Sequence, residues 1–99
     1  MAYVIFEVKK DQIAKINDLA RDDLVSRQSI LTRDASALGI NKDVSYTKIE
    51  GSQEGLKRAE ELAKELEFAK LNEKEAAEVD KKIKEEEESA ADGMGMIFG

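Results

Sequence analysis

Residues 44–66 read VSYTKIEGSQEGLKRAEELAKEL, and the periodicity of the sequence changes halfway along this segment. The part before Gly51 is rich in β-branched and aromatic residues, which favours a strand. Gly51 and Ser52 interrupt that run, and the hydroxyl of Ser52 is suited to capping a helix. Apolar residues then recur at helical spacing, at Leu56, Ala59, Leu62, Ala63 and Leu66. The segment therefore predicts a strand, a tight turn and an amphipathic helix.

A strand and a helix are predicted before this segment. Residues 2–9, AYVIFEVK, alternate as a strand with two different faces does. Asp11 is a candidate N-cap for an amphipathic helix that ends near residues 26–28. Residues 29–40 leave two alternatives open, because they fit either a short strand followed by a loop or a continuation of that helix.

A charged helix and a final strand are predicted after the segment. Asn72 followed by Glu75 resembles a capping box, which indicates that a helix begins there and covers residues 73–90. The apolar stripe of this helix is thin and consists of Ala76, Val79 and Ile83. We therefore expect the helix to be partly exposed. Residues 94–98, MGMIF, are apolar and predict a C-terminal strand that joins the sheet.

The resulting order of elements is β-α-β-β-α(α)-β. This order predicts a single α+β domain over residues 1–99, folded as a two-layer ferredoxin-like sandwich. In that fold the helices lie on one face of an antiparallel four-stranded sheet. The sequence shows no internal repeat and no linker that would divide the chain.

The composition excludes several classes of chemistry. Without Cys and His, the chain has no thiolate or imidazole nucleophile, base or metal ligand. The formal net charge of −6 argues against a nucleic-acid partner, because Lys and Arg supply most affinity for phosphate. No segment approaches the ~20 apolar residues that span a bilayer, so we expect no membrane partner and a cytoplasmic location. The abundance of Lys and Glu is typical of heat-adapted intracellular proteins.

Two features raise the question of a catalytic or binding site. Carboxylates are plentiful, with 22 Asp and Glu residues, but they do not alternate with apolar residues as in a desolvated cleft. Gly51 and Gly55 flank a helix start that offers free N–H groups to an anion, yet Glu50 and Glu54 would repel phosphate. We interpret the first as solvated surface and the second as a structural turn. No catalytic, cofactor-binding or metal-binding residue is assigned, and no cofactor is expected.

The segment IEGSQEGLKRAEELAKEL, residues 49–66, resembles the closing strand and helix of KH-type RNA-binding modules. It equally resembles the βα unit of small ferredoxin-like domains, including regulatory ones that sense ligands. The resemblance covers about a fifth of the chain. KH modules clamp nucleic acid with a G-x-x-G loop, and no such loop precedes this segment, so no functional residue is carried over.

The strand alternation also predicts an apolar sheet face. Tyr3, Ile5, Val44 and Tyr46 fall on the face opposite the predicted core, and we name them as interface candidates. Three coverings of this face are considered. A homodimer that packs sheet on sheet is preferred, a cover formed by helix 73–90 comes second, and a platform for a stacked base or flat ligand comes third.

These observations predict a non-catalytic interaction or regulatory module. It would self-associate as a homodimer, or bind a small ligand, through its sheet face. One alternative is a carboxylate-based enzyme that uses a hard divalent cation. A further alternative is an RNA-binding module of RRM or KH type.

Overall fold

The structure is a computed structural model that describes residues 2–98, with side chains described as far as residue 88. The protein is α+β, with four strands in one antiparallel sheet of order β2-β3-β1-β4. The strands are β1 (Ala2–Lys9), β2 (Ser29–Asp34), β3 (Val44–Gly51) and β4 (Ala69–Lys70). The helices are α1 (Ile16–Ala20), α2 (Gln53–Glu65) and α3 (Glu73–Phe98). Short 3-10 turns lie at η1 (Lys10–Lys15), η2 (Val25–Arg27) and η3 (Ser36–Leu38).

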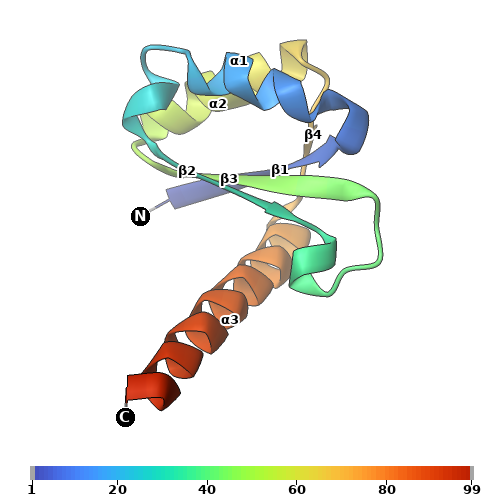
Figure 1. Cartoon of the computed structure of the whole chain (residues 1–99). Coiled ribbons are helices and arrows are strands. Elements are labelled where there is room, and N and C mark those ends of the chain that lie inside the picture. Colours follow the sequence, from blue (N-terminus) through green and yellow to red (C-terminus); the bar gives the residue numbers. More distant parts are fainter. Residues whose placement is uncertain (1, 99) are drawn as a thin grey trace.

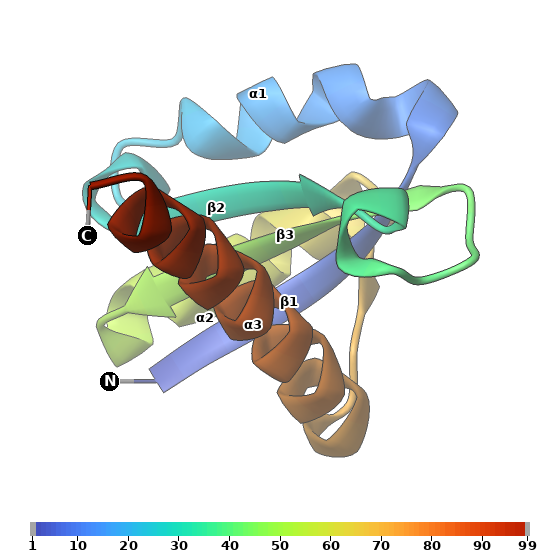
Figure 2. The ribbon, with the colours of Figure 1, turned by 60° about the horizontal axis from the view of Figure 1, so that its bottom comes forward.

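The elements form three layers. Helices α1 and α2 lie on one face of the sheet, and α3 crosses the other face diagonally (Figures 1 and 2). The prediction that all helices share one face is therefore wrong. The cause is the connection after α2, which passes along the edge of the sheet through β4 and delivers α3 to the opposite side.

The fourth strand is not the one that the sequence predicted. Residues 94–98 belong to α3, whereas β4 consists of Ala69 and Lys70, paired with Glu7 and Phe6. Glycine weakens a helix by about 1 kcal/mol but, unlike proline, keeps its N–H, so the glycines of the tail do not force the helix to end. The predicted C-terminal strand at 94–98 is wrong for this reason.

The ambiguous stretch 29–40 contains a strand. Strand β2 pairs with β3 along its whole length, and the turn η3 follows it. Gly39 ends that turn with a φ of 74°, a left-handed conformation that glycine adopts without steric cost. The helix predicted from Asp11 is instead a 3-10 turn followed by the short α1, and Lys9 precedes that turn without a side-chain cap.

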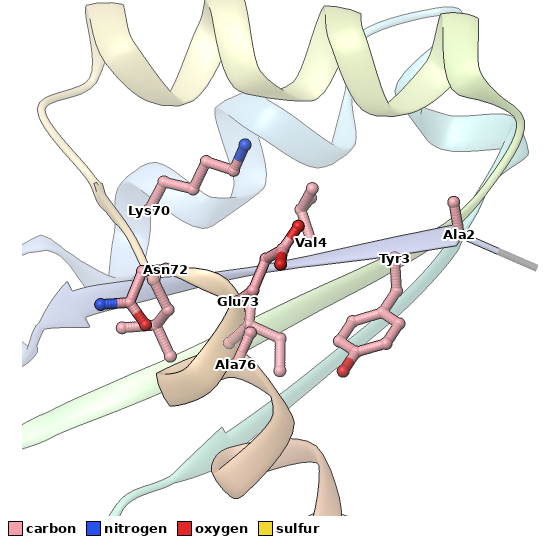
Figure 3. Close-up of a pocket in the computed structure, with 9 residues that line it drawn as sticks. Ala2, Tyr3, Val4, Lys70, Asn72, Glu73 and Ala76 are labelled. Atoms are coloured by element: carbon pink, nitrogen blue, oxygen red, sulfur yellow. The ribbon is translucent and has the colours of Figure 1, made fainter.

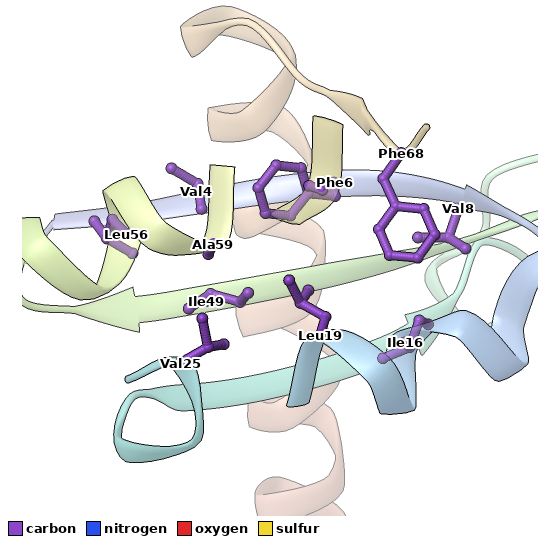
Figure 4. Packing of buried hydrophobic residues seen from close by; sticks show 11 residues of the cluster. Val4, Phe6, Val8, Ile16, Leu19, Val25, Ile49, Leu56, Ala59 and Phe68 are labelled. Carbon is purple, nitrogen blue, oxygen red and sulfur yellow. The ribbon is translucent and has the colours of Figure 1, made fainter. Parts of the chain in front are cut away.

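The first core lies between the sheet and the pair α1 and α2. Val4, Phe6 and Val8 of β1 point to this side, as the alternation predicts, and Phe6 is 1% exposed (Figure 4). Helix α2 contributes its predicted stripe, and its first turn is capped by the Ser52 hydroxyl, which accepts a hydrogen bond from the Gly55 N–H at 3.1 Å. The strand, turn and helix predicted for residues 44–66 are confirmed.

A second core lies between the sheet and α3. Its buried residues are Ile5, Ala35, Leu38, Tyr46, Leu71, Ala76, Val79 and Ile83. The three apolar residues predicted on the last helix are therefore its contacts with the sheet. As predicted, Asn72 caps this helix, since its side-chain oxygen accepts a hydrogen bond from the Glu75 N–H at 2.8 Å.

Candidate functional site

The four predicted interface residues lie beneath or beside α3. Ile5 is 0% exposed and Tyr46 is 2% exposed, while Tyr3 and Val44 are half-buried at the margin of the second core. Helix α3 of the same chain covers this apolar sheet face. Cover by the last helix is the second of the three alternatives given above, whereas the homodimer is preferred from the sequence. A homodimer packed sheet on sheet is therefore not supported, because α3 already buries Ile5 and Tyr46 and partly covers Tyr3 and Val44.

An ion pair is enclosed between α3 and the sheet. Lys48 of β3 donates to Asp80 of α3 at 2.5 Å, and Lys84 contacts the other oxygen of Asp80 at 3.1 Å. The Lys48 ammonium also lies 4.9 Å from the centre of the Tyr3 ring, within cation–π range. Asp80 is 6% exposed, so this group fixes the position of α3 on the sheet.

The two lysines control the ionisation of Asp80. Burial tends to raise the pKa of this carboxyl, but hydrogen bonds from Lys48 and Lys84 outweigh burial and hold its pKa below the ordinary value. In return, the bond to Asp80 raises the pKa of Lys84. The sequence carried a signal for this site, because Asp80 follows Ala76 by four residues and thus falls on the apolar stripe of the helix.

The start of α2 is occupied by a side chain of the protein itself. The amide oxygen of Gln28 accepts a hydrogen bond from the Ser52 N–H at 3.0 Å, and its amide nitrogen donates to the Leu24 carbonyl at 3.0 Å. Gly51 and Gly55 leave room for this contact, since a Cβ at Gly55 would lie 2.2 Å from the Gln28 side-chain carbon Cδ. The glycines have a structural role, in agreement with the interpretation as a turn.

The Gln28 contact predicts that Gly55→Ala changes the stability in opposite directions with and without the Gln28 side chain. In the natural sequence, Gly55→Ala should displace Gln28 and lower the free energy of unfolding by about 1 kcal/mol. In a Gln28→Ala background the same change should raise it by up to about 1 kcal/mol, because alanine is the better helix former. Urea unfolding of the four variants measures both effects. Equal effects of Gly55→Ala in the two backgrounds would contradict the role assigned to Gln28.

Asp22, which follows α1, also has partners within the chain. Asp22 accepts hydrogen bonds from the Leu24 and Val25 N–H groups, each at 3.2 Å, and from Arg58 at 3.0 Å. Burial tends to raise the pKa of Asp22, but these bonds prevail and lower it. Among residues whose side chains are described, no three acidic groups lie close enough to hold a metal ion together.

An uncovered stretch of sheet edge remains. Strand β4 pairs with β1 only at Phe6 and Glu7, and the Leu71 N–H adds one bond to the Ile5 carbonyl at 3.0 Å. The edge of β1 before Ile5 borders a pocket of about 620 Å³ (Figure 3). Its lining residues are Ala2, Tyr3, Val4, Ile5, Lys70, Leu71, Asn72, Glu73 and Ala76.

The polar groups that line this pocket differ in their partners. Lys70 forms an ion pair with Glu60 of α2, and Asn72 is used as the cap of α3. Glu73 is exposed, and no ion pair joins it to another side chain described by the structure. The pocket thus combines apolar walls, an open strand edge and a carboxylate. Of its residues the sequence named only Tyr3 and Ile5 as interface candidates. It placed Asn72 and Ala76 at a helix cap and on an apolar stripe, and it gave no sign that they would lie beside β1.

Comparison with known proteins adds no relative, because no protein family, no curated protein and no solved structure matches the chain. Within residues 2–98, none of the helices has the length and apolar character needed to cross a lipid bilayer.

Proposed function

We propose that the chain is a non-catalytic interaction module that binds its partner at the uncovered edge of β1. The observation that supports this proposal is the incomplete pairing of β1, whose edge before Ile5 has no strand beside it and adjoins the pocket. A strand edge with unpaired N–H and C=O groups is a ready template for another extended segment. The sheet thus remains the binding element, but its edge replaces its covered face.

The layout of the fold supports the same proposal. We propose a ferredoxin-like arrangement to which α3 is added as a third layer. The strand order supports this arrangement. Strand β3 lies between β1 and β2 and runs antiparallel to both, and β1 in turn lies between β3 and β4. In this layout β4 is an edge strand, and here it has only two residues. Its shortness is the reason that part of β1 lies open. A cytoplasmic location stays a prediction from composition.

Amide chemical shifts test the proposed binding site. Titration of ¹⁵N-labelled protein with extended peptides and with small apolar fragments should shift the amides of residues 2–5 and 71–76. The amides of α1, on the other side of the sheet, serve as the internal control. Shifts confined to α1 or to the outer surface of α3, with none along β1, would overturn the proposal.

A further inference from the structure

We propose that the partner at the β1 edge is a basic, extended peptide segment that adds a strand to the sheet. This inference rests on the proposed function and names the chemistry of the partner. Three observations carry it: the direction of the backbone groups of β1, the residues that line the pocket beside them, and the charge at its border.

The backbone of Tyr3 faces the open edge. The Ile5 carbonyl points away from β3, because it accepts the bond from the Leu71 N–H. Residues two apart in a strand direct their N–H and C=O groups to the same side, so the groups of Tyr3 point to that edge as well. A residue placed opposite Tyr3 in an added antiparallel strand can exchange both of its backbone hydrogen bonds with it.

The pocket fits the side chain of that residue. Tyr3 points to the α3 side of the sheet, whereas Val4 points to the α2 side (Figure 3). An added residue opposite Tyr3 directs its side chain to the α3 side as well, where Leu71 and Ala76 line the pocket. A medium-sized apolar side chain such as valine suits this position.

The charges around the pocket favour a cationic partner. Glu60 neutralises Lys70, so Glu73 supplies the local charge of the lining. The chain as a whole carries a formal charge of −6, which attracts a basic segment and repels an acidic one. A second copy of this chain is disfavoured by the same charge.

Three capped peptides test the inference: Ac-KVTVTK-NH₂, Ac-QVTVTQ-NH₂ and Ac-EVTVTE-NH₂. We expect all to shift the amides of residues 2–5, with the lysine peptide binding about two- to fivefold more tightly than the glutamine peptide. Glu73→Gln should reduce this preference to the smaller part that comes from the net charge of the chain. Glu75→Gln should keep it, because Glu75 also lies in the first turn of α3 but does not line the pocket. Added salt should weaken the preference in the natural sequence.

A pair of variants at Tyr3 tests the backbone contact. Tyr3→Pro removes the N–H that faces the edge, whereas Tyr3→Ala keeps it, and both lose the ring. We expect the proline variant to bind the lysine peptide about tenfold more weakly than the alanine variant, with both showing native circular dichroism. Equal binding by the two variants would overturn strand addition.

The remaining outcomes separate the two proposals. If the three peptides bind equally well, and Glu73→Gln does not change their affinities, the proposal of a basic partner is overturned. The proposal of a binding site at the β1 edge is then unaffected. Failure of every peptide and fragment to shift the β1 amides overturns the proposed function itself. A third outcome is that the natural chain sediments as a dimer, and that Tyr3→Pro dissociates this dimer whereas Tyr3→Ala does not. A second copy of the chain would then occupy the edge, and this too overturns the inference.

Discussion

Changing Ile83 to aspartate is expected to detach α3 from the sheet and to lower the free energy of unfolding by about 4 kcal/mol or more. Ile83 is 1% exposed and packs with Val79 in the second core. Removal of a large buried aliphatic side chain alone costs about 2–5 kcal/mol, and a carboxylate left without a partner in that place adds to the loss. Urea unfolding measures the change, and faster hydrogen exchange in α3 locates it.

The control for this prediction lies on the same helix. Ala77→Asp introduces the same charge at an exposed position of α3 and should cost less than about 1 kcal/mol, mainly through lower helix propensity. If Ile83→Asp were as mild as Ala77→Asp, α3 would not stabilise the fold, and the apolar face beneath it would need another cover. Dye binding by exposed Ile5 and Tyr46 should accompany detachment of the helix.

Removing Asp80 is the second change with a large expected effect. Asp80→Ala leaves the ammonium of Lys48 nearly enclosed, with a side chain that is 12% exposed and no carboxylate beside it. Breaking a buried ion pair on one side costs about 3–5 kcal/mol, and we expect about 2–4 kcal/mol here because the pair keeps some contact with solvent. As a control, Glu86→Ala breaks the more exposed bond to Arg33 and should cost less than about 1 kcal/mol.

Replacing both partners tests whether the cost comes from the unpaired charge. The double variant Lys48→Met with Asp80→Leu should recover most of the lost stability, since it leaves no buried charge unmatched. If the double variant were as unstable as Asp80→Ala, the loss of stability would come from the missing ion pair itself and not from the unpaired charge of Lys48.

The same carboxyl makes stability depend on pH. The pKa of Asp80 is lower in the folded chain than its ordinary value of 3.8, so its contribution is complete above about pH 4–5 and is lost as the pH falls below that range. The difference in stability between the Asp80→Asn variant and the natural sequence should therefore become smaller in acid. Thermal unfolding between pH 7 and pH 3, at constant ionic strength, measures this convergence. A constant difference across that range would contradict the assigned ion pair.

The sequence could predict only a small part of the candidate site. Tyr3 and Ile5 were found because period-two alternation reports which face of a strand each residue occupies. Leu71 and Glu73 belong to a connection and a helix start, which carry no information about the strand that they will lie beside. The sequence does not point to Lys48 and Asp80, because charged residues on a helix surface are usually solvated, although Asp80 interrupts an apolar stripe.

By itself the sequence determined those local elements that have a clear periodicity or cap. The strand and helix of residues 44–66, the caps at Ser52 and Asn72 and the alternation of β1 all depend on neighbours a few residues away. Only the tertiary structure decided which helix covers the second face of the sheet and how much of the edge of β1 stays unpaired. A thin apolar stripe does not state which face a helix will cover, and a strand of two residues has no period to detect. Both depend on contacts between residues distant in the chain, and these decided that α3 closes the sheet face and leaves the start of β1 open.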